Sequence, residues 1–455
     1  MLKKINRGIN SIACIMIAGF SLILLESFDN PDKNKNTQIT IRGDRFYFNN
    51  EIINKGAPAE GLLMNVRMVN AVFEDKSANI ASKMKFDPIS NTNKFLEKLP
   101  EYVSSGVNAF TISLQGGSPG YEGAVNSAYN SDGSLKQEYL QRVEKVISAC
   151  ARNHSAVILS CFYQRQHSNY SALKGKDCIF KALENTVKWL VARKFTNVLL
   201  EVTNEYGHNG FRNWPDGEWF ITEAAQVELI RLAKRTAPSL LVSTSSMGDG
   251  TFDNVLAQEA DFLLIHFNNS SIDQYQSAIN RLKKYGKPIV CNEDDKVGRE
   301  GAVALATSIF YGCGGGYMNL KQNQSFPFVF HGVSDDTAVY RMFKNLTTTG
   351  FQIDTPTLRN VPSIKITSPG DGQLFSVNKS IVVRLSHHPV DSVPFRINIL
   401  ANNQVVKSVG QQLQNSISFD KPGVYILEAV VCDLDGREIY RSAKTDIIVK
   451  DESHE

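Results

Sequence analysis

Two apolar stretches, Ala156-Val157-Ile158-Leu159-Ser160-Cys161 and Val198-Leu199-Leu200-Glu201-Val202, flank a segment in which apolar residues recur at helical spacing between residues 179 and 191. Each stretch has the length of a buried strand, and the intervening segment has the length and 3.6-residue period of a helix. A strand, a helix and a second strand in this order form a unit whose two strands run parallel. The sequence around residues 156–202 therefore predicts an α/β fold.

The same alternation extends from about residue 60 to residue 350. Further helical segments lie at residues 135–151, 221–236 and 272–285. Eight such units fit a (β/α)8 barrel better than an open, doubly wound sheet. The eight strand-like runs are Leu62–Val69, Val107–Leu114, Ala156–Cys161, Val198–Val202, Leu240–Thr244, Phe262–His266, Pro288–Cys291 and Gly316–Leu320.

Glycine patterns in the barrel do not indicate a phosphate site. No G-x-G-x-x-G follows the first run, so no dinucleotide cofactor is expected, and no other cofactor is implied. The run Gly312–Gly316 precedes the last predicted strand, where close backbone packing explains it better than a phosphate loop.

All-β segments flank the predicted barrel. Short apolar runs around Gly43-Asp44 and Asn49-Asn50 predict an N-terminal hairpin, so the barrel with its hairpin is assigned to residues 39–355. From residue 361 to residue 450, six or seven short alternating runs separated by turn residues predict an immunoglobulin-like β-sandwich. Asp433-Leu434-Asp435-Gly436 fits a hairpin turn there better than a calcium loop.

Residues 1–26 resemble an export leader: three basic residues precede an almost uncharged run, and a polar spacer follows at residues 27–38. A cleaved signal peptide and an uncleaved N-terminal anchor are both compatible with this run, and cleavage is favoured. Either alternative predicts an extracytoplasmic protein that is secreted, periplasmic or on the cell surface. The anchor is the only membrane contact expected.

Composition excludes several classes of protein. Hydrophobic residues make up 42% and charged residues 21% of the 455 residues, which is typical of a soluble globular chain. The formal charge of +3 is too small to indicate a nucleic-acid-binding face. The seven cysteines contain no C-x-x-C pair, which argues against a zinc ribbon or a redox motif.

Two carboxylates stand where the barrel would carry chemistry, at the carboxyl ends of its strands. Glu205 follows Asn204 after the fourth run, and Glu293 follows Asn292 after the seventh. Paired carboxylates can cleave a glycosidic bond when one is protonated at the leaving oxygen and the other is ionised below the anomeric carbon. The alternative is that both are solvated loop residues.

Glu201-x-x-Asn204-Glu205, together with the Pro-Ile-Val-x-x-Glu293 run, resembles the clan A retaining glycoside hydrolases, which include the family 5 cellulases. The resemblance covers the barrel, about two thirds of the chain. It implies that Glu205 is the general acid/base, that Asn204 binds the sugar 2-hydroxyl and that Glu293 is the nucleophile. It also implies an oligo- or polysaccharide substrate with β linkages.

The sequence departs from that family at several positions. His266-x-Asn268 stands where the family has His-x-Tyr, and Asp294-Asp295 follows the nucleophile where Phe-Gly is common. His266 and Asn268 are nevertheless candidates for binding substrate. Further candidates at strand ends or in loops are Arg67, Gln115, Tyr163 and Trp214.

Several alternatives remain open at this point. Trp214 and Trp219 either form a sugar platform or cover the following helix. The acids at 293–295 could bind a metal, although no His joins them in the sequence, so none is predicted. Glu201 is the next candidate for the acid. A catalytically silent carbohydrate-binding or surface protein on the same barrel is the competing function, whereas a serine esterase lacks its G-x-S-x-G motif.

Overall fold

The computed structural model describes residues 37–74, 86–116, 126–164, 173–324, 328–353, 363–370, 372–388, 394–442 and 444–451. The predicted leader at residues 1–26 lies outside these ranges, as does most of the spacer. Among the described residues, no helix combines the length and apolar character that crossing a lipid bilayer requires.

A small antiparallel sheet precedes the barrel, as predicted. Asn49 and Asn50 make the second turn with φ of 50° and 69°, the left-handed pair that tight hairpins need. Phe46 is fully buried and packs edge-on against Phe262 at the amino end of a barrel strand, with 6.2 Å between ring centroids. The sheet therefore closes that end of the barrel. Its strands are β1 (Ile39–Arg42), β2 (Arg45–Phe48) and β3 (Glu51–Ile52).

Eight parallel strands form the barrel, which confirms the predicted fold class. Their order in the sheet is β10-β9-β8-β5-β4-β13-β12-β11, and a parallel bridge between Ser245 and Leu264 joins the two ends. The strands are β4 (Met64–Arg67), β5 (Ala109–Ser113), β8 (Ala156–Phe162), β9 (Val198–Thr203), β10 (Leu241–Ser243), β11 (Leu263–His266), β12 (Ile289–Glu293) and β13 (Cys313–Tyr317).

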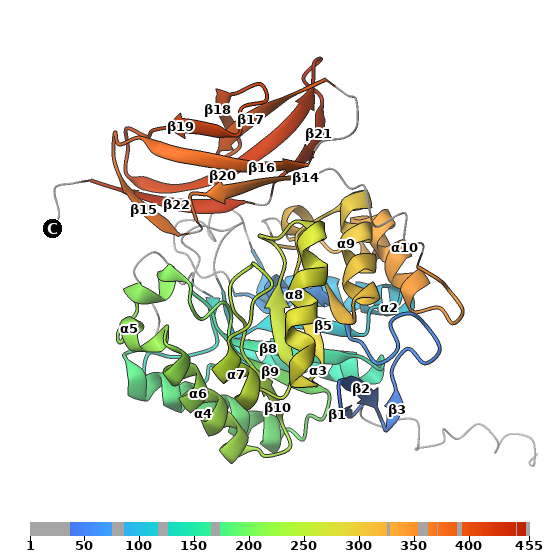
Figure 1. Cartoon of the computed structure of the whole chain (residues 1–455). Helices are drawn as coiled ribbons and strands as arrows, with labels where there is room; N and C mark the ends of the chain where they lie inside the picture. Colours follow the sequence, from blue (N-terminus) through green and yellow to red (C-terminus); the bar gives the residue numbers. More distant parts are fainter. Residues whose placement is uncertain are drawn as a thin grey trace, which may run out of the picture. The chain divides into compact units, whose positions relative to one another are not determined.

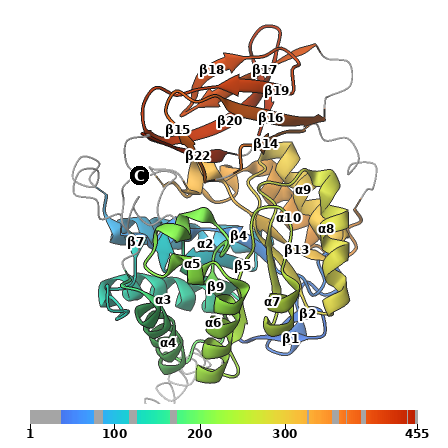
Figure 2. The ribbon, with the colours of Figure 1, turned by 60° about the vertical axis from the view of Figure 1, so that its left-hand side comes forward.

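Helices surround this sheet, and α4 and α6 lie side by side on its outside (Figures 1 and 2). A short antiparallel pair, β6 (Gln115–Gly116) and β7 (Asn126–Ser127), follows β5. The helices are α2 (Pro88–Ser104), α3 (Gln137–Arg152), α4 (Lys176–Ala192), α5 (Gly217–Phe220), α6 (Glu223–Thr236), α7 (Asn254–Glu259), α8 (Tyr275–Leu282), α9 (Gly298–Phe310) and α10 (Thr337–Leu346).

The last strand begins earlier than the predicted run Gly316–Leu320. It spans Cys313–Tyr317, so most of the glycine run forms the strand instead of preceding it. Close packing is the physical reason: a Cβ on Gly316 would lie 2.1 Å from the carbonyl oxygen of Cys291 on β12. Apolar content alone places this strand too late because its glycines carry no side chains.

The lumen of the barrel contains two contrasting layers. Near the amino ends of the strands, apolar side chains form one cluster with the N-terminal sheet. We call these the lower layer: Leu63, Ala109, Ile158, Leu199, Leu241, Leu264 and Val290. Two residues further along each of these seven strands, on the same face, the buried side chains are all polar. We call these the upper layer: Asn65, Thr111, Ser160, Glu201, Ser243, His266 and Asn292.

The C-terminal region is all-β, as predicted. One sheet has the order β14-β16-β19 and the other β15-β22-β20-β17-β18, with β21 paired to β20. Side chains from both sheets share one apolar core, so the region is a sandwich. The strands are β14 (Ser363–Ser368), β15 (Gln373–Ser376), β16 (Ile381–His388), β17 (Phe395–Ala401), β18 (Gln404–Ser408), β19 (Gln414–Ile417), β20 (Gly423–Asp433), β21 (Glu438–Arg441) and β22 (Thr445–Lys450).

Strands β15, β18 and β21 are not distinguished in the sequence, because each is short and mostly exposed. The turn at Asp433–Gly436 connects β20 to β21, and Gly436 donates its backbone N–H to the carbonyl of Asp433 at 3.1 Å. This confirms a hairpin turn at that position.

Candidate active site

Glu205 and Glu293 meet at the carboxyl ends of β9 and β12. Glu293 is the last residue of β12, and Glu205 lies two residues past β9. Both are nearly buried, with 5% and 6% of their surface exposed. A carboxylate oxygen of one lies within 4.8 Å of a carboxylate oxygen of the other. The barrel therefore brings together two carboxylates that follow separate strands in the sequence.

The backbone at Glu205 is strained. Its φ is +48°, in the left-handed region that residues other than glycine seldom occupy. Two hydrogen bonds hold this turn: the Glu205 N–H donates to Ser245 Oγ at 3.0 Å, and the His208 N–H donates to the Glu205 carbonyl at 2.8 Å. Such strain persists where surrounding contacts enforce it, which is common at functional sites.

His266 lies between the two carboxylates. Its Nδ1 is 3.0 Å from Glu205 Oε1 and 3.6 Å from Glu293 Oε2, and the ring is fully buried. Burial lowers the pKa of His266, but Glu293, Glu205 and Glu201 together raise it above its usual value. The imidazole is thus positioned to share a proton with either carboxylate.

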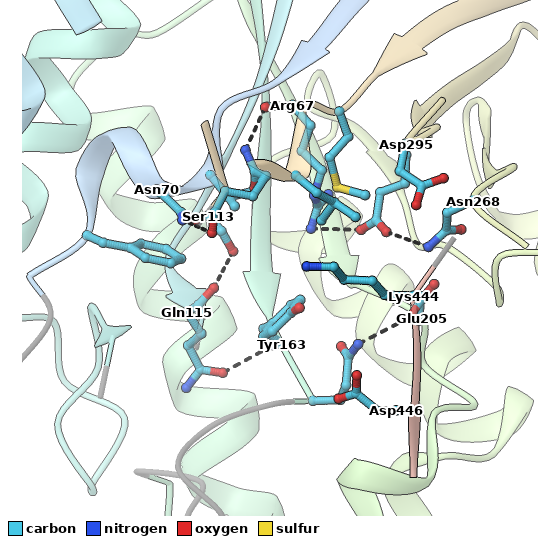
Figure 3. A pocket seen from close by; sticks show the side chains of 18 of the residues that line it. Arg67, Asn70, Ser113, Gln115, Tyr163, Glu205, Asn268, Asp295, Lys444 and Asp446 are labelled. Carbon is cyan, nitrogen blue, oxygen red and sulfur yellow. Dashed lines mark hydrogen bonds and ion pairs between the residues drawn. The ribbon is translucent and has the colours of Figure 1, made fainter. Parts of the chain in front are cut away.

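Glu293 has further donors on its other side. Arg67 Nη2 forms an ion pair with Glu293 Oε1 at 2.8 Å, and Asn268 Nδ2 donates to Glu293 Oε2 at 3.3 Å (Figure 3). The pKa of Glu293 is raised above its usual value, because burial, Glu205 and Glu201 raise it more than Arg67 and His266 lower it. The contacts themselves favour the ionised form, because Arg67 is a permanent cation.

Amide side chains complete a ring of contacts around the site. Arg67 Nη2 also donates to Asn204 Oδ1 at 3.1 Å, and Asn204 Nδ2 donates to Gln164 Oε1 at 3.3 Å. Gln164 Nε2 then donates to Glu205 Oε2 at 3.1 Å. Glu205 therefore receives the neutral amide of Gln164 and contacts the imidazole of His266, which it shares with Glu293.

The three consecutive acids at the end of β12 point to different places. Asp294 bonds to the hydroxyl of Tyr275 and to Lys296 Nζ, the latter at 3.0 Å. Asp295 lines the same pocket as Glu293, and burial raises the pKa of Asp295 to about 7. Because Asp294 is committed elsewhere, the three carboxylates do not converge on one metal position.

Glu205, His266 and Glu293 offer one ligand atom each within 4.8 Å, a spacing that could hold a cation. The guanidinium of Arg67 lies 2.8 Å from Glu293, and its positive charge opposes a metal ion there. The residues present therefore fit proton transfer better than metal binding.

The pocket above the carboxylates includes most of the side chains proposed for substrate binding. Arg67, Gln115, Tyr163 and Asn268 line it, together with Gln164 (Figure 3). Gln115 is held in place by its own bonds, since its Oε1 accepts the Tyr163 N–H at 3.4 Å and its Nε2 donates to Ser127 Oγ at 3.2 Å. Asn204 and His266 lie beside these groups in the ring of contacts described above.

Trp214 is not placed at the pocket, contrary to the predicted sugar platform. It is 4% exposed and packs against Phe211 and Phe220, with ring centroids 4.9 and 5.2 Å apart. Trp219 stacks on Phe180 of α4 at 5.7 Å. Both indoles therefore bury the short helix α5 and its neighbours, the alternative considered from the sequence.

Two polar residues beneath the carboxylates were missed in the sequence. Ser245 supports the backbone of Glu205, and Asn292 donates to Glu201 at 3.4 Å. The available signal was their position: Asn292 directly precedes Glu293, and Ser245 belongs to a run of hydroxyl residues after the fifth strand. Asn70 and Phe73 in the pocket carried no signal of this kind.

No protein-family model matches the sequence, and no curated protein is significantly similar to it. Among solved structures, a glycoside hydrolase described as putative from Bacteroides vulgatus is 12% identical, with a TM-score of 0.46 over 91% of this chain and 83% of that one. A β-1,4-D-mannanase from Cryptopygus antarcticus is 13% identical, with a TM-score of 0.46 over 69% and 96%. A tri-modular GH5 endo-β-1,4-glucanase from Bacillus licheniformis is 15% identical, with a TM-score of 0.39 over 87% and 80%.

Proposed function

We propose that this chain is a retaining glycoside hydrolase that cleaves a β-linked oligo- or polysaccharide by double displacement. The observation that carries the proposal is the pair of buried carboxylates, Glu205 and Glu293, which line one pocket and have oxygens within 4.8 Å of each other. Retaining enzymes hold their carboxyl groups about 5–5.5 Å apart, whereas inverting enzymes leave room for a water between them. The short separation supports retention.

The contacts of the two carboxylates support a role for each. Glu293, paired with Arg67 and receiving Asn268, attacks the anomeric carbon as the ionised nucleophile. Glu205, with Gln164 and His266 as partners, gives its proton to the leaving oxygen and later takes one from the attacking water. The first proton leaves with the aglycone, and the proton taken from water restores the acid form of Glu205 at the end of each cycle.

Arg67, Gln115, Tyr163, Asn204, His266 and Asn268 are proposed to bind the sugar or to orient the two carboxylates. These polar side chains, set among apolar ones in the lining, agree with a ligand that has both hydroxyl groups and apolar ring faces. Export through the N-terminal leader is part of the proposal and rests on the sequence of residues 1–26 alone.

The test compares Glu205→Ala with Glu293→Ala on an aryl glycoside that has a good leaving group. Glu205→Ala should form the glycosyl-enzyme rapidly, show a burst and give a β-glycosyl azide when azide is added. On natural glycans, its turnover should fall by about 10²–10⁴-fold because the leaving group needs the proton. Glu293→Ala should give an α-glycosyl azide instead.

The competing function is a catalytically silent carbohydrate-binding or cell-surface protein. It predicts that the wild-type protein binds glycans without hydrolysing any aryl glycoside in a panel of β-glucosides, β-mannosides and β-galactosides. That result would overturn the proposal. Equal losses on aryl and natural substrates in Glu205→Ala, without a burst or azide rescue, would place the acid at another residue.

A further inference from the structure

A third carboxylate lies beneath the catalytic pair. Glu201 belongs to the upper layer of the lumen and is fully buried. Ser245 Oγ donates to its Oε1 at 2.6 Å, and Asn292 Nδ2 donates to its Oε2 at 3.4 Å. It does not line the pocket, so it is not positioned to touch the sugar.

Both partners of Glu201 lead directly to a catalytic carboxylate. Ser245 Oγ accepts the backbone N–H of Glu205 at 3.0 Å, so the same hydroxyl that bonds Glu201 holds the strained turn of the proposed acid. Asn292 is the residue before Glu293 on β12. Glu201 thereby connects β9, the segment that follows β10 and β12 at the height of the site.

The charge of Glu201 is not matched by an ion pair. Among the described residues, no Lys or Arg lies within ion-pair distance of it, and its hydrogen-bond donors are neutral. The ionisable groups that feel its charge are His266 on β11, Glu293 on β12 and the buried thiol of Cys161 on β8. Glu205 and Glu293 also act on His266, and Arg67 acts on Glu293.

An amide at this position would satisfy the same contacts. Glutamine has the shape of glutamate, and Asn292 Oδ1 has no hydrogen-bond partner among the described residues, so a rotated Asn292 amide could accept from the new side chain of Glu201→Gln. A buried carboxylate is more costly than a buried amide. The negative charge is therefore not needed to fill the lumen.

Resting on the function proposed above, we infer that Glu201 is a positioning residue. Through Ser245 it holds the turn of Glu205, through Asn292 it contacts the strand that ends in Glu293, and its carboxylate lies in the same buried layer as the imidazole of His266. Without this charge, His266 and Glu293 would each release their proton more readily. Both limbs of the pH–activity profile would then move to lower pH, because Glu293 ionises and the shared proton leaves earlier.

The test measures Glu201→Gln, with Ser160→Ala as the matched control. Ser160 pairs with Glu201 in the β8–β9 ladder and belongs to the same layer, but it is not charged. Glu201→Gln should lower kcat about tenfold at the wild-type optimum and move both limbs down by about one pH unit, with KM nearly unchanged. Ser160→Ala should leave all three quantities unchanged.

A second measurement does not depend on catalysis. The titration of the His266 imidazole, followed by NMR in wild type and Glu201→Gln, should show a lower pKa in the variant. Ser245→Ala retains the charge but loses the tether, so it should reduce kcat without moving the limbs or the His266 titration.

Unchanged titration of His266 in a folded Glu201→Gln would overturn the inference whether or not the protein is a glycosidase. If Glu201→Gln does not fold, a lowered pKa of His266 or shifted limbs in Ser245→Ala, which retains the Glu201 carboxylate, would overturn the inference by assigning the effect to geometry. Unshifted limbs with reduced kcat in Ser245→Ala would support it. A shifted titration in a protein that hydrolyses no glycoside would refute only the proposed function.

Discussion

The two layers of the barrel lumen are built by the same strands, yet they differ in chemistry. Leu199 and Leu264 of the lower layer are fully buried among apolar neighbours, next to the closing sheet. Glu201 and His266, two residues further along the same strands, are equally buried but are polar and interact with each other's charge. These side chains are thus equally buried in both layers, but they change from apolar to polar between the lower layer and the upper one.

The difference separates what stabilises the barrel from what it does. Apolar burial in the lower layer contributes roughly 25 cal/mol per Å² of surface removed from water. The upper layer gives up this contribution, and each polar group buried there costs free energy unless it is hydrogen-bonded. Fully buried polar residues at corresponding positions of adjacent strands are therefore the informative feature of this fold.

The largest stability effect is expected in the lower layer. Leu199→Ala should lower the free energy of unfolding by about 2–5 kcal/mol, because it removes a fully buried side chain and leaves a cavity. The proposed catalytic groups lie at the other end of the lumen, so kcat of the folded variant should stay within about threefold of wild type. Urea unfolding and initial rates check both values. A large fall in kcat with unchanged stability would contradict the separation of the two layers.

An intermediate effect on stability is expected at Asp295, which lies at the rim of the barrel above the upper layer. Burial raises the pKa of Asp295 to about 7, so its ionisation opposes folding as pH rises from about 4 towards 7. Asp295→Asn should therefore stabilise the protein at pH 8 by up to about 4 kcal/mol and have little effect near pH 4. Melting temperatures of both proteins across this range test the sign. A gain that is equal at both pH values would contradict the assigned cause.

Much of the barrel could be predicted because its strands are continuous apolar runs, and parallel strands must end at one rim. That rule was enough to bring Glu205 and Glu293 together. It did not identify the ion pair between Arg67 and Glu293, since the two residues are distant in sequence and only the closed sheet makes them neighbours. The sequence could not show that Trp214 is buried, for a related reason. Its burial depends on Phe211 and Phe220, which become its neighbours only once the loop folds.

The smallest effects on stability are expected from two hydroxyl groups of the upper layer, those of Thr111 and Ser160. Thr111 Oγ1 donates to Asn65 Oδ1 at 3.1 Å, whereas Ser160 Oγ has no hydrogen-bond partner among the described residues. Thr111→Val removes a donor from a buried amide and should cost about 1–2 kcal/mol, since Asn65 loses its partner. Ser160→Ala removes a hydroxyl that has no hydrogen-bond partner among the described residues. Its free energy of unfolding should therefore lie within about 0.5 kcal/mol of the wild-type value.

Urea titrations with matched m-values measure the difference between these two variants. A cost for Ser160→Ala as large as that for Thr111→Val would mean that its hydroxyl is satisfied by solvent inside the lumen, and the upper layer would then be a hydrated chamber. A small cost in both variants would mean that hydrogen bonding in this layer contributes little to folding. The polarity of the upper layer would then be explained by the charges of Glu201, His266 and the proposed catalytic carboxylates, not by stability.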